Sequence, residues 1–154
     1  TLDNLQPTQV NPLLLSGFAL AGANRRDGAD PEAEDGILTA EEIAAMDLRG
    51  VQWAILSACD TGAGQIKAGE GVLGLRRAFQ VAGAETIVMT LWAIDDAAAA
   101  DWVRALYSAR FLEGLSTAEA VRRASLDLIR RQRERGATTH PFYWGSWVAA
   151  GRYE

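Results

Sequence analysis

The chain has 154 residues, of which 49% are hydrophobic and 23% are charged, with one cysteine and one histidine. That length suits one compact domain with a substantial core. A single cysteine excludes an internal disulfide, and with one histidine it falls short of the about four ligands of a zinc site. The net charge of -5 argues against bulk binding of nucleic acid. No apolar run reaches the ~20 residues of a membrane span, and the first residues carry no basic signal region. We expect a protein of the cytoplasm, which is a reducing compartment, and we expect no membrane as a partner.

The first third of the chain predicts one ambiguous apolar segment, a loop and a helix. Leu13 to Ala21 is an apolar run that fits either a buried strand or a short helix. The polar residues 22–36 predict an exposed, mobile loop. A helix is expected from Leu38 on, because Thr39 and Glu42 have the spacing of a capping box.

Two apolar segments in the middle of the chain predict buried strands. Residues 51–58 are short, nearly all apolar and partly β-branched, which is typical of a parallel strand covered on both faces. Residues 72–82 are amphipathic and predict a helix that stops at Gly83. Residues 85–92 predict the second buried strand.

Two further helices are expected. Asp95 and Asp96 can cap a helix over residues 97–112. Ser116 and Glu119 form a second capping box, which begins a helix that reaches about residue 135.

The aromatic-rich residues 142–150 are the last strand candidate. Strands alternating with helices predict an α/β fold, with a mainly parallel sheet flanked by helices. Ligands of such sheets bind beyond the C-terminal ends of the strands. This rule points to the loop at Cys59 and to the loop after Trp92.

Cys59 stands where a nucleophile would stand, at the C-terminal end of a predicted strand. Asp60, Thr61 and Gly62 then turn the chain, and a backbone N–H at such a turn can hold an oxyanion. A thiolate nucleophile usually needs a histidine partner. The alternative is a buried cysteine that acts as a small apolar filler, and position alone favours neither.

His140 is the only histidine of the chain. It precedes Pro141 and an aromatic cluster, which favours a structural role at the start of a strand over pairing with Cys59. If His140 has this structural role, the histidine that would act as base for Cys59 is missing from these 154 residues.

Four acidic residues are candidates for a substrate pocket: Asp60, Glu70, Asp95 and Asp96. A carboxylate pair at Asp95 and Asp96 can bind a basic group of a peptide, cap a helix, or do both with one aspartate each. Glu70 either shapes a pocket mouth or is a solvated loop charge.

Metal and nucleotide sites are not expected, and no cofactor is predicted. The glycine-rich residues 62–71 lack the Lys and Ser or Thr that follow the last glycine of a phosphate loop. A calcium loop with Gly36 at its sixth position would place Pro31 and Ala33 where side-chain oxygens are needed. The arginine-rich last helix is interpreted as a solvated face.

Several segments match, in order, the pattern of one known family. They are Asn11-Pro12-Leu13-Leu14-Leu15-Ser16-Gly17, Asp35-Gly36-Ile37-Leu38-Thr39-Ala40-Glu41-Glu42, Leu56-Ser57-Ala58-Cys59-Asp60-Thr61-Gly62, Gly69-Glu70-Gly71-Val72-Leu73-Gly74-Leu75-Arg76-Arg77-Ala78-Phe79, Ala82-Gly83-Ala84, Leu91-Trp92-Ala93-Ile94-Asp95-Asp96 and His140-Pro141-Phe142-Tyr143-Trp144-Gly145-Ser146-Trp147. This pattern resembles the CHAT peptidase family, which are caspase-like cysteine peptidases often attached to tetratricopeptide repeats. The resemblance runs from about Asn11 to Gly151.

The resemblance implies a caspase-like α/β fold and hydrolysis of peptide bonds in a protein or peptide substrate. It implies Cys59 as the nucleophile, with its own backbone N–H in the oxyanion hole. Asp95 and Asp96 would lie beside the pocket for the residue before the scissile bond.

The family's catalytic histidine lies upstream of the segment that matches Asn11, in a His-Gly motif that these 154 residues lack. We therefore expect residues 1–154 to be the C-terminal portion of one peptidase domain, incomplete and inactive without an upstream segment supplied as a separate chain. A bacterial source and a tetratricopeptide-repeat regulatory domain as a partner are also expected. The alternative is a non-catalytic interaction or regulatory module of the same fold.

Overall fold

The computed structural model describes residues 12–24, 35–57 and 70–152. These residues belong to two compact units, each described by itself below. Unit 1 comprises the described residues up to Met46 together with 70–82, and unit 2 comprises 47–57 and 83–152. Most of the loop predicted to be mobile, and Cys59 itself, lie outside the described residues.

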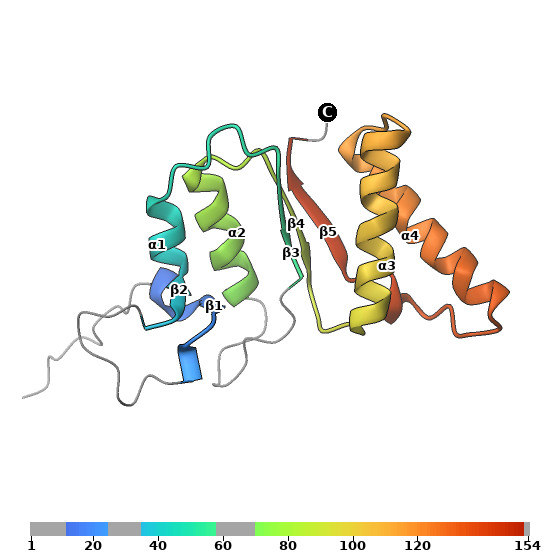
Figure 1. The fold of residues 1–154 in the computed structure, drawn as a ribbon, viewed down its shortest axis with the longest axis horizontal. Coiled ribbons are helices and arrows are strands. Elements are labelled where there is room, and N and C mark those ends of the chain that lie inside the picture. The colour runs from blue at the N-terminus through green and yellow to red at the C-terminus, as the bar shows by residue number, and fades with distance from the viewer. Residues whose placement is uncertain (1–11, 25–34, 58–69, 153–154) are drawn as a thin grey trace, which may run out of the picture. The chain divides into compact units, whose positions relative to one another are not determined.

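Unit 1 pairs two short strands and two helices (Figure 1). Its elements are a 3-10 helix at Pro12–Leu15, β1 (Gly17–Ala19), β2 (Ile37–Thr39), α1 (Ala40–Ala45) and α2 (Glu70–Ala82). The strands β1 and β2 are antiparallel. The apolar run at 13–21 is therefore a 3-10 turn followed by a strand. Leu38 belongs to β2, so the prediction that it begins a helix is wrong, and the helix starts at Ala40.

The capping box of α1 is confirmed. Thr39 accepts a hydrogen bond from the backbone N–H of Glu42 at 3.2 Å, and the Glu42 carboxylate accepts from the Thr39 backbone N–H at 2.6 Å. The hydrogen bonds from the Thr39 backbone and hydroxyl hold the pKa of Glu42 below its usual value. One turn further, Ile43 packs with Leu75 and Ala78 of α2 in a buried cluster. The amphipathic pattern predicted for α2 thus faces this core.

Unit 2 contains a three-stranded sheet in the order β3-β4-β5. Its strands are β3 (Trp53–Leu56), β4 (Thr86–Thr90) and β5 (Trp147–Gly151). The strands β3 and β4 are parallel, whereas β4 and β5 are antiparallel. A mainly parallel sheet is therefore not confirmed for the described residues, although the α/β class is.

The antiparallel direction of β5 follows from the two helices that connect it to β4. These are α3 (Asp96–Tyr107), extended by a π-helical turn at Ser108–Leu112, and α4 (Thr117–Glu134). Each helix reverses the direction of the chain, so the chain returns to the sheet opposite to β4 (Figure 1). A 3-10 turn at Pro141–Tyr143 occupies the start of the predicted last strand, which begins only at Trp147.

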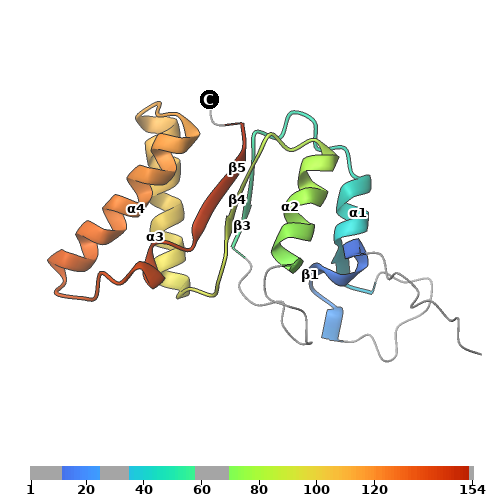
Figure 2. The same cartoon turned by 180° about the vertical axis from the view of Figure 1, so that it is seen from behind.

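The helices α3 and α4 cover one face of this sheet and form the core of unit 2 with it (Figure 2). Trp102 and Leu106 of α3 have no exposed surface, and Val88 of β4 is equally buried. All five residues of β4 are buried, as predicted. The four residues of β3 are only half-buried, less than predicted, because β3 is one of the two edge strands among the described strands.

Candidate active site

The strands β3 and β4 end at the same edge of the sheet. They pair in parallel register, with Leu56 opposite Met89. The segment after β3 leads within three residues to Cys59, and the segment after β4 contains Trp92 and Asp95. This is the edge at which the rule for parallel strands places ligands.

Asp95 and Asp96 both lie at this edge, at the start of α3, and both are exposed. Asp95 is the N-cap residue, and its Oδ1 accepts a hydrogen bond from the Ala98 backbone N–H at 3.0 Å. Asp96 is in the first turn of the helix, where a carboxylate interacts favourably with the helix dipole. Helix capping therefore occupies one oxygen of Asp95.

The other sequence-predicted site residues are not brought together in the described part of the chain. Cys59 and Asp60 lie outside the described residues. Glu70 is the first residue of α2 in unit 1, and its side chain is not among those described. The roles predicted for these three residues remain predictions.

An aromatic pair at the same edge was not predicted as a site. The rings of Trp92 and Phe142 stack with centroids 6.2 Å apart, and the Trp92 Nε1–H donates to the Phe142 carbonyl at 2.8 Å. Their exposed fractions are 36% and 47%. Fifty residues separate the two, so no local pattern connects them. Together they offer an exposed apolar surface near Asp95.

His140 has a structural role in the described residues. It caps the 3-10 turn, and its Nδ1 accepts a hydrogen bond from the Phe142 backbone N–H at 3.2 Å. This agrees with the interpretation of His140 as a residue that shapes the approach to the last strand. One of its two ring nitrogens is therefore engaged by the backbone.

Metal-binding clusters and membrane-spanning helices are both absent from the described residues. No group of three or more His, Cys, Asp or Glu side chains among them is placed to hold a metal ion. No helix in this part of the chain combines the length and the hydropathy needed to cross a membrane.

The strand directions and the residues that follow β3 and β4 define an α/β domain whose parallel strands lead to one candidate functional edge. Residues 6–152 match the family model of the CHAT domain, so the chain belongs to the CHAT domain family, which is caspase-like.

Two relatives are similar to this chain. They are tetratricopeptide repeat protein 28 of Mus musculus, 30% identical over 122 residues, and that of Homo sapiens, 28% identical over 121 residues. Each match covers 79% of this chain and 5% of the relative, so the chain spans about one twentieth of the length of these relatives. Both are animal proteins, and they lend no support to the expected bacterial source.

Proposed function

We propose that this chain supplies the nucleophile of a caspase-like cysteine endopeptidase, with Cys59 as that nucleophile. The observation that carries the proposal is the parallel pairing of β3 with β4. The strand β3 ends at Leu56 on the edge where Trp92 and Asp95 lie, and Cys59 follows three residues later in the sequence, which supports a site there. Membership of the caspase-like CHAT family supports peptide-bond hydrolysis as the reaction.

In this proposal the Cys59 thiolate attacks the carbonyl carbon of the scissile peptide bond. The backbone N–H of Cys59 donates to the oxyanion that forms. A histidine takes the thiol proton and then gives it to the leaving amine as the C–N bond breaks. Water hydrolyses the thioester, releasing the acid product and restoring the thiol.

The histidine comes, in this proposal, from a His-Gly segment upstream of the region that matches Asn11. His140 is the only histidine within the chain, and its Nδ1 already accepts a backbone hydrogen bond. The outer side of β3, one of the two edge strands among the described strands, is the proposed place where the upstream segment adds a strand. An edge strand carries backbone groups ready to pair with another strand.

The substrate is proposed to carry a basic residue before the scissile bond. Asp96 and Asp95 supply negative charge at the edge, with Asp96 the principal partner because capping occupies one oxygen of Asp95. Asp60, the residue after Cys59, is proposed as a further pocket residue, and the role of Glu70 remains a prediction from the sequence. The exposed Trp92–Phe142 pair would contact a neighbouring apolar side chain of the substrate.

The test combines the chain with the upstream segment and a peptide electrophile that carries arginine before its reactive group. Labelling is read by mass spectrometry, and it is unambiguous because the chain has one thiol. We expect labelling of Cys59, none in Cys59→Ala, and slow labelling of the chain alone. An electrophile with glutamine in place of arginine is the matched control. Equal labelling with and without the upstream segment would contradict the proposal.

The second candidate is a non-catalytic interaction module of the same family. It is favoured by the names of the two relatives, which describe repeats and not an activity. The upstream coding sequence distinguishes the candidates, because a His-Gly motif after a buried strand is required only by the enzyme. In both cases we propose a cytoplasmic protein with a tetratricopeptide-repeat domain as a regulatory partner.

A further inference from the structure

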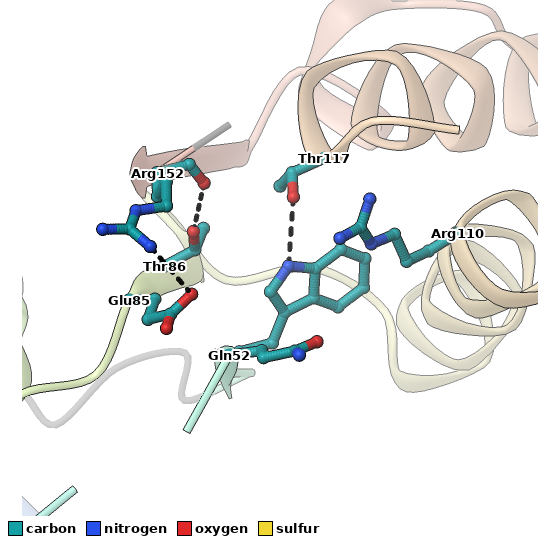
Figure 3. A pocket seen from close by; sticks show the side chains of 7 residues that line it. Gln52, Glu85, Thr86, Arg110, Thr117 and Arg152 are labelled. Carbon is teal, nitrogen blue, oxygen red and sulfur yellow. Dashed lines mark hydrogen bonds and ion pairs between the residues drawn. The ribbon is translucent and has the colours of Figure 1, made fainter. Parts of the chain in front are cut away.

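Unit 2 contains a pocket of about 210 Å³ at the end of the sheet opposite to the candidate active site (Figure 3). Its lining includes Trp53 and Thr86, the first residues of the parallel strands β3 and β4, and Arg152, which follows β5. Arg110 and Thr117 close it from the helical layer. Because a strand rises about 3.3 Å per residue, the five residues of β4 separate the pocket from the other edge by on the order of 13 Å.

Arg110 is held in place before any ligand arrives. It lies in the π-helical turn at Ser108–Leu112, a kind of turn that is frequent at functional sites. Its Nη1 donates to the Leu115 carbonyl at 3.0 Å, and its Cζ lies 6.0 Å from the centroid of the Trp53 ring. These contacts restrict the side chain, so less rotational freedom is lost when a ligand binds.

The walls of the pocket are fixed by hydrogen bonds between lining residues (Figure 3). The Trp53 Nε1–H donates to Thr117 Oγ1 at 3.2 Å, which joins β3 to the first residue of α4. The Thr86 hydroxyl donates to the Arg152 carbonyl, which joins β4 to the end of β5. Thr86 and Thr117 are almost fully buried. The pocket walls are therefore held by the same contacts that join the strands and helices of unit 2.

The charge of the pocket favours an anion. Among the described lining residues, Arg110 and Arg152 are positively charged and Glu85 is negatively charged, so their side chains carry one net positive charge. Arg152 lies beside Glu85, whereas Arg110 lies beside Trp53 (Figure 3). The Arg152–Glu85 ion pair is long, at 3.9 Å, and both side chains are more than a third exposed, which makes it weak. No ion pair joins Glu85 to Arg110 among the described residues.

We propose that this pocket binds a small oxyanion, a carboxylate or a phosphate group, with Arg110 as its principal partner. The planar guanidinium group forms paired hydrogen bonds with such anions, and Arg152 adds a second positive charge. The pocket is separate from the proposed catalytic edge, so this inference does not depend on peptidase activity.

The test uses the indole N–H signals of the full chain in ¹H–¹⁵N spectra. The chain has five tryptophans, of which Trp53 lines the pocket, and Trp53→Phe assigns its signal. Sodium phosphate and N-acetylglutamate amide are titrated separately at constant ionic strength, with N-acetylglutamine amide as the uncharged control. We expect a saturable shift of the Trp53 signal with at least one of the two anions. The anion that acts identifies phosphate or carboxylate as the ligand group.

Arg110→Gln is expected to weaken binding by at least about tenfold, the lower range for loss of a charged hydrogen bond. Arg104→Gln is the matched control, because Arg104 is an exposed arginine on α3 that pairs with Asp101. Unchanged signals of the other four indoles show that the Arg110 variant keeps its fold. No saturable shift with either anion, or an equal shift in the Arg110→Gln variant, would overturn the proposal.

Discussion

The indole rings of Trp102 and Trp147 lie face to face, with centroids 4.1 Å apart and planes inclined by 1°. Trp102 belongs to α3 and Trp147 to β5, so the stack joins a helix to the sheet. The Trp102 Nε1–H also donates to Ser125 Oγ of α4 at 3.1 Å. Both helices and β5 are therefore held at one position in the core of unit 2.

Replacement of these tryptophans is expected to destabilise the chain unequally. Trp102→Ala and Trp147→Ala should each cost about 3–5 kcal/mol, since each removes a buried aromatic ring. Trp147→Phe should cost less than Trp102→Phe, because only Trp102 loses a hydrogen bond found among the described residues. Urea unfolding followed by circular dichroism measures the order. A larger loss for Trp147→Phe than for Trp102→Phe would contradict this interpretation.

Asp95 allows its capping role to be separated from its proposed role in substrate binding. Asp95→Ala removes the cap of α3 and should cost about 1 kcal/mol, whereas Asp95→Asn keeps a good cap and removes only the charge. Stability to urea should therefore fall in the alanine variant alone.

Labelling by the arginine-bearing electrophile gives the second readout for the aspartates. It should weaken in both Asp96→Asn and Asp95→Asn. Stability should be unchanged in Asp95→Asn, whereas Asp96→Asn should lose about 0.3–1 kcal/mol, because it removes a negative charge from the N-terminal turn of α3. Unaltered labelling of the double asparagine variant would remove both aspartates from the substrate site.

The capping box at the start of α4 predicts a pH dependence of stability. The hydrogen bonds from the Ser116 hydroxyl and then from its backbone lower the pKa of Glu119 below its ordinary value of 4.5. A lowered folded-state pKa stabilises the fold above the unfolded pKa, and this contribution is lost as the pH falls through the folded pKa. Ser116→Ala should cost about 1 kcal/mol at neutral pH.

The same variant should show a smaller loss of stability below pH 4.5 than the unchanged chain, because its Glu119 has lost the larger cause of the pKa shift. Urea midpoints at neutral pH and below pH 4.5 provide the comparison. Identical pH dependence in both proteins would show that the capping box does not carry this effect.

Gly151 is expected to tolerate no side chain. Its φ is +133°, a conformation that L-residues rarely adopt, and a Cβ there would collide with the Glu85 carbonyl oxygen beside the adjacent strand. Gly151→Ala should therefore lower stability by several kcal/mol, roughly the sum of backbone strain and a disturbed strand pair. Gly136→Ala is the matched control, since Gly136 also has a positive φ but a Cβ there would meet no atom within 4 Å. Equal losses would assign the effect to backbone conformation alone.

Local signals in the sequence predicted the elements whose causes are local. Both capping boxes, at Thr39 and at Ser116, begin helices because the interacting residues are three positions apart. The strand β2 was missed because it has three residues and its partner lies about twenty residues upstream. Both helices between β4 and β5 were predicted, but the mainly parallel sheet followed from the general rule for strands that alternate with single helices, and a second helix reverses the direction of the next strand.

The features of the candidate site and of the pocket also divide into those with a local cause in the sequence and those formed by distant segments. Asp95 was predicted to cap a helix because capping depends on adjacent residues, and the structure confirms this role. The Trp92–Phe142 pair and the pocket around Arg110 bring together residues from distant segments, so no sequence spacing indicated them. The π-helical turn that positions Arg110 has no such signal either, since its residues also fit an ordinary helix.

The outer side of β3 has a consequence for handling the chain in solution. Its sequence, Trp-Ala-Ile-Leu, carries no charge and no proline, the features by which proteins usually discourage edge-to-edge pairing. Among the described residues no strand pairs with this side of β3, so a second copy of the chain can compete there with the proposed upstream segment. Self-association should rise with concentration, so the reconstitution proposed above should work best when the dilute chain meets an excess of the proposed upstream segment.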